Sequence, residues 1–200
     1  MNRLAACALA LVAAAFTLPA VAGAVGSPAP DFSLSSLDGK PVKLSDYRGK
    51  YVVLEWVNPG CPFVQKHYDS GNMPRLQKDA TAQGVVWLMV NSTNPSHGDF
   101  KSAAQLAGWL KDKGAAPSAA MLDQDGKVGK LYSAKTTPHM YVIDPQGKLI
   151  YAGAIDSIRS TDPADIKTAT NYVKVALADA KAGKPVSPAS TQAYGCTIKY

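Results

Sequence analysis

The chain has 200 residues, a formal net charge of +6 and 46% hydrophobic residues. That length suits one domain with a sizeable core, and three cysteines are too few for a small scaffold built on disulfides. The composition excludes an intrinsically disordered chain and a polytopic membrane protein. Basic residues form no long run, so the sequence predicts no nucleic-acid partner.

The first 24 residues have the pattern of a secretory signal peptide. A short positive segment, residues 1–3, precedes an apolar stretch over residues 4–17, and small residues then offer cleavage after Ala22 or Ala24. An uncleaved membrane anchor is the alternative, but the apolar stretch is short for a membrane span. The sequence therefore predicts a periplasmic or secreted protein without stable membrane insertion.

Cleavage of this segment would change the cysteine count. It would remove Cys7 and leave Cys61 and Cys196 in an oxidising compartment, where thiols are paired or kept reduced for a purpose. We expect the mature chain to form one domain over residues 25–183, followed by a tail over residues 184–200 that carries Cys196.

Strand and helix patterns alternate along the predicted domain. In chain order, we expect a hairpin over residues 32–44, a buried strand over 51–57, a helix that begins at Cys61–Pro62 and breaks near 71–74, a strand over 85–90, a helix over 100–110, a strand over 119–122, a short helix over 128–132, strands over 139–143 and 149–152, a last helix between Asp162 and Gly183, and a flexible linker over 185–193. This order predicts an α/β sandwich with a mixed sheet.

Cys61 is the strongest candidate for chemistry. It stands between a buried strand and the start of a helix, where unpaired backbone N–H groups and the helix dipole favour a thiolate. Such a position lowers the pKa of a cysteine from about 8.5 toward roughly 3.5–7.5, which makes the sulfur a nucleophile at neutral pH. A buried structural cysteine is the alternative, but the flanking Pro59, Gly60 and Pro62 favour an exposed loop.

The sequence resembles the thioredoxin superfamily at several points between residues 27 and 182. These are Ala-Pro-Asp-Phe at 29–32, Gly-Lys at 49–50, the buried strand, Cys61–Pro62, and Thr137–Pro138 directly before a strand. More narrowly, it is similar to the peroxiredoxin-like redoxin branch, which is related to alkyl hydroperoxide reductase C and thiol-specific antioxidant proteins. Gly-Cys-Thr-Ile-Lys at 195–199 is similar to a tail of some members.

This resemblance implies a thioredoxin-like fold, in which a mixed central sheet is flanked by helices and preceded by an N-terminal β-hairpin. It implies thiol chemistry at Cys61 without a cofactor or a metal, and Pro62, Thr137, Pro138 and His139 would support that cysteine. Pro138 would be a cis-proline that packs beside Cys61.

Two departures from the peroxiredoxin pattern weaken the prediction of peroxidase activity. Leu54 and Asn58 occupy the Pro and Thr positions of the Pro-x-x-x-Thr-x-x-Cys motif. Pro138 falls close to where the peroxide-activating arginine is expected, and Arg75 or Arg159 would have to replace that arginine.

Cys196 is the candidate partner of Cys61. Val64 occupies the second cysteine position of the thioredoxin Cys-x-x-Cys motif, so no disulfide forms within the motif. Cys196 could resolve a sulfenic acid or a mixed disulfide on Cys61. It could instead form a permanent structural disulfide with Cys61, or tether the tail to another protein.

Two further polar residues have open roles. His139 follows Pro138 and would stabilise a thiolate at Cys61 if its ring were protonated, although a lone histidine is more often structural or exposed. Glu55 lies within the buried strand. In thioredoxin-like folds a buried carboxylate can accept a proton behind the cysteine, and a surface-facing edge is the alternative.

The preferred function is an exported thiol-disulfide oxidoreductase that uses Cys61, with either Cys196 or an external thiol releasing the covalent intermediate and a thiol protein or small thiol as electron donor. A thiol peroxidase with a peroxide substrate is the first alternative. A copper chaperone using Cys61, His139 and Cys196 is a second, because thiolate and imidazole suit copper. A redox-inert binding module is the third.

Overall fold

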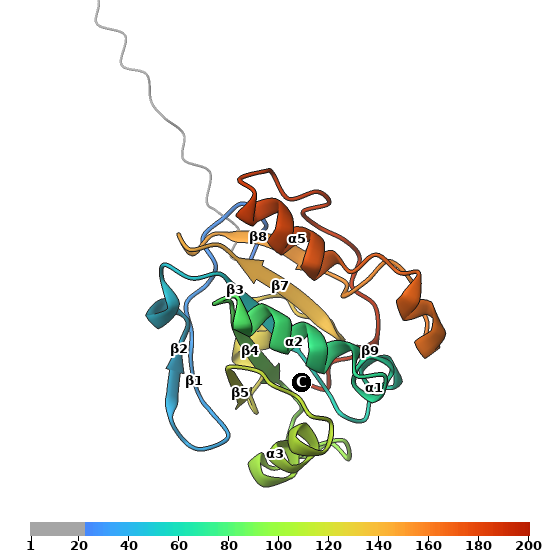
Figure 1. Cartoon of the computed structure of the whole chain (residues 1–200). Helices are drawn as coiled ribbons and strands as arrows, with labels where there is room; N and C mark the ends of the chain where they lie inside the picture. The colour runs from blue at the N-terminus through green and yellow to red at the C-terminus, as the bar shows by residue number, and fades with distance from the viewer. Residues whose placement is uncertain (1–22) are drawn as a thin grey trace, which may run out of the picture.

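A five-stranded mixed sheet forms the centre of the computed structural model, which describes residues 23–200 (Figure 1). Its strand order is β5 (Ala119–Leu122), β4 (Val86–Asn91), β3 (Val52–Trp56), β7 (His139–Ile143) and β8 (Leu149–Gly153). The first three strands run parallel, whereas β7 and β8 are antiparallel to their neighbours. Residues 1–22, which contain most of the predicted signal peptide and Cys7, lie outside the described residues.

Two hydrophobic layers cover the two faces of this sheet. On one face pack α1 (Pro62–Asp69), α2 (Asn72–Ala82), α3 (Ala103–Asp112) and α5 (Tyr172–Lys181). On the other face lie the hairpin of β1 (Ser33–Ser35) and β2 (Pro41–Lys43), the 3-10 helix η1 (Leu44–Tyr47) and α4 (Lys127–Leu131). Because strand side chains alternate between faces, each central strand contributes to both cores.

The predicted break after the first helix is confirmed. Helix α1 ends at Asp69, and α2 begins at Asn72 after Gly71, whose φ of +69° is a left-handed conformation that glycine adopts without strain. Helix α3 starts three residues later than predicted because Ser102 caps it. The Ser102 hydroxyl accepts the Gln105 N–H, and the Gln105 side chain accepts the Ser102 N–H.

The prediction of one last helix between Asp162 and Gly183 is wrong. The structure forms a 3-10 helix, η2 (Pro163–Lys167), and then the separate helix α5. Between them the chain pairs with the loop after β8, since the Thr170 carbonyl accepts the Ser157 N–H and Asn171 forms a bridge with Asp156. The spacing of apolar residues along a helix does not reveal such contacts with a distant part of the chain.

The tail is not a flexible linker but a docked segment. The Ala189 carbonyl accepts the N–H of Ala152 at the edge of β8, and the Ala152 carbonyl accepts the Thr191 N–H, both at 3.2 Å. Farther along, β9 (Cys196–Thr197) pairs antiparallel with β6 (Thr136–Thr137). Figure 1 shows the tail passing from α5 to β9 near the start of α1.

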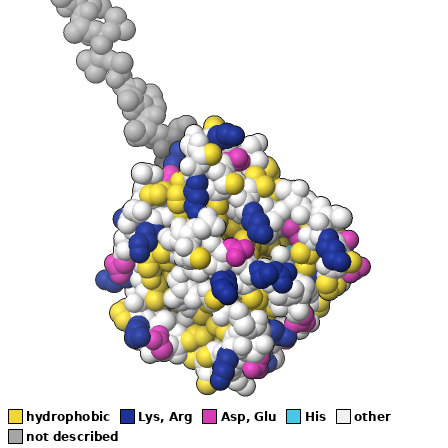
Figure 2. Space-filling model, in the orientation of Figure 1, with side chains coloured by type: hydrophobic (Ala, Val, Ile, Leu, Met, Phe, Trp, Pro, Cys, Tyr) yellow, Lys and Arg dark blue, Asp and Glu magenta, His cyan; other side chains and the backbone are white. Residues whose placement is uncertain are grey.

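The surface and the helices show two further features. On the face shown in Figure 2, basic and acidic side chains are interspersed over the whole surface rather than gathered by sign. None of the helices within residues 23–200 has the length and apolar character that a membrane crossing requires.

The cap of α5 gives a direct test of this last-helix geometry. The Asn171 side chain accepts the N–H of Lys174 at 3.0 Å, so Asn171→Ala should lower the free energy of unfolding by about 1 kcal/mol. Asn171→Asp, which keeps the acceptor, should cost less than half as much. Urea denaturation at neutral pH measures both, and equal losses would contradict the role of the cap.

Candidate active site

Cys61 is held at the start of α1 by a tight loop after β3. The Asn58 carbonyl accepts the Cys61 N–H at 3.0 Å, and the Asn58 side chain accepts the Gly60 N–H at 2.8 Å. Cys61 is the N-cap of α1, with extended backbone angles, and Pro62 occupies the first helical position. The sequence prediction of a cysteine at a helix N-terminus is therefore confirmed.

The loop before β7 meets Cys61 from the other side. The peptide bond between Thr137 and Pro138 is cis, as the resemblance implies. The carbonyl oxygen of Thr137 lies 3.0 Å from Cys61 Sγ. Three of the predicted supporting residues thus lie at the cysteine. Pro62 follows it in the chain, the Thr137 carbonyl contacts its sulfur, and Pro138 forms the cis peptide bond with Thr137.

Cys61 and Cys196 form a disulfide, with their Cα atoms 5.8 Å apart. The backbone N–H of Cys196 also points at Cys61 Sγ, with an N–S distance of 3.4 Å. The expectation that Cys61 lies in an exposed loop is wrong, because it is only 2% exposed. The tail and the Thr137 carbonyl cover it, whereas Cys196 is partly exposed.

A glycine allows the tail to approach this closely. Gly195 has a φ of +137°, and a Cβ atom at this position would overlap the Thr137 carbonyl group. Its neighbour Tyr194 is buried and packs edge-on against Phe63 of α1, with ring centroids 5.7 Å apart. Any larger residue at position 195 would push Cys196 away from β6.

His139 points away from the disulfide. Met140 and Val142 of β7 share a core with Cys61, so by strand alternation His139 and Tyr141 face the opposite side of the sheet. The Nδ1 atom of His139 accepts the Lys135 N–H at 3.3 Å. Burial, and next the charge of Lys135, lower the pKa of His139 to about 4, so its ring is neutral at pH 7.

Glu55 is fully buried, so the surface-facing interpretation is wrong. Tyr68 and Trp87 donate hydrogen bonds of 2.7 and 2.8 Å to its carboxylate, and Gln77 donates a third of 3.0 Å. Burial raises the pKa of Glu55, although these three donors oppose the shift. Its role as a proton acceptor remains a prediction.

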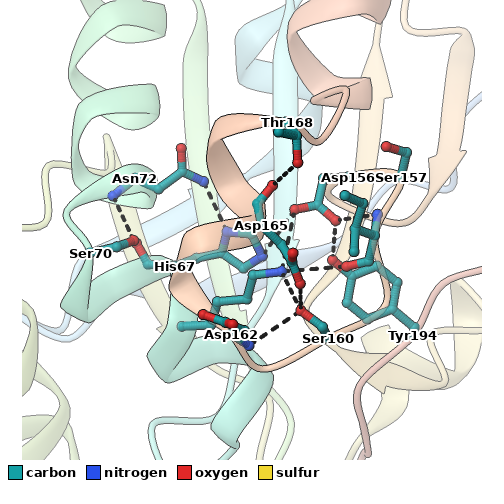
Figure 3. A network of polar contacts seen from close by, with 12 residues as sticks. His67, Ser70, Asn72, Asp156, Ser157, Ser160, Asp162, Asp165, Thr168 and Tyr194 are labelled. Carbon is teal, nitrogen blue, oxygen red and sulfur yellow. Dashed lines mark hydrogen bonds and ion pairs between the residues drawn. The ribbon is translucent and has the colours of Figure 1, made fainter.

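A buried cluster of polar side chains between α1, the loop after β8 and the tail was not predicted (Figure 3). The Asp156 carboxylate faces Lys66 at 3.9 Å and His67 at 3.7 Å, and its other oxygen accepts a hydrogen bond from the Tyr194 hydroxyl. Adjacent Lys and His residues in a helix ordinarily indicate an exposed face. The burial of Lys66 and His67 is therefore evident only from the folded structure. Burial, which Asp156 opposes and Lys66 reinforces, lowers the pKa of His67 to about 4.

The donor groups for a metal are scattered. Within residues 23–200, no group of three or more His, Cys, Asp or Glu side chains is arranged to hold a metal ion. Cys61 and His139, two of the ligands considered for copper, lie on opposite faces of the sheet.

Comparison with known proteins agrees with this geometry. Strands β3 and β4 pair in parallel at the centre of the sheet. The chain superposes with a TM-score of 0.51 on the exposed lipoprotein thioredoxin Etrx1 from Streptococcus pneumoniae, at 27% identity. The match covers 70% of this chain and 97% of that one. It superposes with a TM-score of 0.76 on an uncharacterized conserved protein from Geobacillus kaustophilus, at 26% identity over 89% of this chain and 93% of that one. The predicted thioredoxin-like fold is confirmed.

Curated relatives carry thiol chemistry in their names. The chain is 33% identical over 128 residues to the thiol-disulfide oxidoreductase ResA of Geobacillus thermodenitrificans, which covers 63% of this chain and 67% of that protein. It is 34% identical over 86 residues to peroxiredoxin Bcp of Bacillus subtilis, 41% of this chain and 52% of the relative. The chain thus spans about two thirds of the length of the ResA relative and about half of the length of the peroxiredoxin relative.

The fold and the cysteine pair beside a cis-proline define a thiol-based oxidoreductase of the thioredoxin superfamily. The AhpC/TSA family model matches residues 25–152. The chain belongs to the AhpC/TSA family.

The two buried histidines predict how stability depends on pH. Between about pH 6.5 and 4 the unfolded chain protonates both rings while the folded protein keeps them neutral. The unfolded form then binds more protons than the folded form. The free energy of unfolding should therefore decrease as the pH is lowered through this range, by up to about 1.4 kcal/mol per pH unit for each histidine.

A histidine variant isolates this effect in urea denaturation at several pH values. His139→Gln should remove roughly half of the slope. An unaltered slope in His139→Gln would show that His139 is not neutral in the folded protein.

Proposed function

We propose that this protein is an exported thiol-disulfide oxidoreductase in which Cys61 is the nucleophile and Cys196 the resolving cysteine. The disulfide between the N-cap of α1 and the docked tail is the observation that carries the proposal. Residues 25–183 would form the redoxin domain, and residues 184–200 a tail that belongs to the active site. The ResA relative supports disulfide exchange as the reaction.

The reaction balances with two thiols and one substrate disulfide. The Cys61 thiolate attacks one sulfur of the substrate, forms a mixed disulfide and releases the other sulfur as a thiolate. Cys196 loses its proton to solvent and attacks Cys61 Sγ, which forms the Cys61–Cys196 disulfide and releases the second substrate thiolate. The substrate gains two electrons, and a donor thiol protein or small thiol returns the pair to its dithiol form.

The surroundings of Cys61 favour the thiolate that this scheme requires. The N-terminus of α1 places the positive end of a helix dipole at the sulfur. The Cys196 N–H, 3.4 Å from Cys61 Sγ, is a hydrogen-bond donor for the charge that develops there. His139 adds no positive charge at neutral pH.

The helix offers no resolving thiol. Val64 is buried in α1 at the position where a Cys-x-x-Cys protein carries its second cysteine. The tail offers the resolving thiol instead, because β6–β9 pairing sets Cys196 opposite Thr137, whose carbonyl lies at Cys61 Sγ. Export rests on the charged, apolar and small-residue segments of residues 1–24. An oxidising compartment suits a protein whose two remaining cysteines are paired.

Single-cysteine variants test the two roles. With a disulfide-bonded peptide as substrate and dithiothreitol as donor, Cys61→Ser should abolish catalysed reduction. Cys196→Ser should stall as a mixed disulfide on Cys61, which intact mass detects, and turnover should fall by at least about tenfold because resolution becomes intermolecular.

Thr197→Ser is the matched control, since it alters β9 without touching either sulfur. Activity retained by Cys61→Ser would refute the nucleophile. Wild-type turnover in Cys196→Ser would refute the resolving role and leave a structural disulfide.

Thiol peroxidase activity is the second candidate. The peroxiredoxin relative favours it. In that reaction the Cys61 thiolate attacks a peroxide oxygen, an alcohol or water leaves, and Cys196 converts the sulfenic acid to the disulfide with loss of water.

Hydrogen peroxide separates the two candidates. A peroxidase should give a stoichiometric sulfenic acid on Cys61 in the Cys196→Ser variant, trapped by dimedone and detected by mass. Arg159→Lys should slow its formation by about tenfold if Arg159 polarises the peroxide. No adduct at a modest excess of peroxide would remove this candidate and leave disulfide exchange.

A further inference from the structure

A single buried carboxylate connects the segments that carry the two cysteines. Asp156 follows β8 and is only 4% exposed. Its Oδ1 atom accepts the Ile158 N–H at 3.0 Å and the hydroxyl of Tyr194. Its Oδ2 atom faces Lys66 Nζ at 3.9 Å and His67 Nε2 at 3.7 Å. Figure 3 shows His67 of α1, Asp156 of the loop after β8 and Tyr194 of the tail converging.

The residues on the two sides of Asp156 belong to the same segments as the two cysteines. Lys66 and His67 are in the last turn of α1, the helix whose N-cap is Cys61. Tyr194 lies two residues before Cys196 in the tail. Lys66 also donates to the Ile158 carbonyl at 3.4 Å, which ties the loop around Asp156 to the helix.

We propose that Asp156 is a positioning residue that, through Tyr194, keeps the tail docked after the disulfide opens. Cys196 then stays beside Cys61 in the dithiol form, and the pair closes as a preorganised intramolecular reaction. The proposal rests on the proposed function in one respect, that the Cys61–Cys196 pair opens and closes.

The gain over a freely moving tail is large. A thiol on a flexible linker reaches its partner at roughly millimolar effective concentration, whereas well-oriented groups within one structure reach effective molarities many orders of magnitude higher. The tail therefore favours the disulfide only to the extent that contacts other than the disulfide hold it. Tyr194, Ile198 and Tyr200 provide such contacts.

The Asp156–Tyr194 contact differs from the others in its charge. A hydrogen bond to a buried carboxylate is stronger than one between neutral groups, and its loss leaves the carboxylate short of a donor. By contrast, the Tyr200 hydroxyl donates to the neutral Ala134 carbonyl at 2.8 Å. Burial and Asp156 both raise the pKa of Tyr194, so its hydroxyl remains a donor through the neutral range.

Tyr194→Phe tests the contact with little disturbance, because the ring can keep its packing against Phe63. The protein is equilibrated with reduced and oxidised glutathione, and alkylation followed by intact mass gives the equilibrium constant of the Cys61–Cys196 pair. We expect the effective concentration of the two thiols to fall by about tenfold or more in Tyr194→Phe. Tyr200→Phe, at the other end of the tail, should change it by less than about threefold.

Equal losses in Tyr194→Phe and Tyr200→Phe would overturn the proposal, since docking would then be spread along the tail. An unchanged constant in Tyr194→Phe would overturn it as well. So would a wild-type disulfide that excess dithiothreitol leaves closed, because the pair would be a permanent structural link.

Asp156→Asn completes a double-mutant cycle. If Asp156 acts through Tyr194, the double variant should lose no more than about twofold beyond the larger single loss. Multiplicative losses would refute this coupling. A merely structural Asp156 would lower the stability of the oxidised and reduced forms equally and leave the glutathione equilibrium unchanged. If Asp156→Asn fails to fold, the Tyr194→Phe and Tyr200→Phe comparison still decides.

This measurement is independent of catalysis. Glutathione equilibrium reports only on the protein's own cysteines, so a shift in Tyr194→Phe would support Asp156 even if the protein reduced no disulfide substrate. Normal catalysis with an unshifted equilibrium would support the proposed function and refute the positioning role.

Discussion

Backbone pairing between β6 and β9 is the interaction on which the site depends. It sets Cys196 opposite Thr137, whose carbonyl is already at Cys61 Sγ. Two peptide segments far apart in sequence thereby bring two sulfurs to bonding distance without a Cys-x-x-Cys motif. The absence of a side chain at Gly195 permits this approach. The rest of the fold, a sheet with helices on one face and a hairpin on the other, holds β6 in place.

Much of the fold follows from local sequence, because each central strand is a short apolar run and most helices have clear ends. The position of Cys61 was predictable for the same reason, since a buried strand followed by Pro-Gly-Cys-Pro indicates a loop and a helix start. The division of the last helix was not, because it depends on Ser157 and Asp156 pairing with Thr170 and Asn171.

The errors that concern Cys61 and the C-terminal segment have one physical cause, which is the docked tail. Composition alone describes residues 185–193 as a linker, since hydrogen bonds to a sheet edge leave no pattern in a Pro/Ser/Thr-rich segment. Docking of the tail buries Cys61 and brings Tyr194 to Asp156. Lys66 and His67 lie at the same junction. Contacts between segments far apart in sequence, rather than local propensities, therefore decide which polar and charged side chains meet at this junction.

The sequence separation of 135 residues between the two cysteines links redox state to the fold as a whole. A disulfide that closes so long a loop restricts the unfolded chain more than the folded one, by about 5 kcal/mol in the chain-entropy model. Reduction would remove this constraint from most of the domain at once. The redox state of the Cys61–Cys196 pair therefore also determines how readily the chain unfolds. The dithiol form is then more susceptible to proteolysis than the disulfide form.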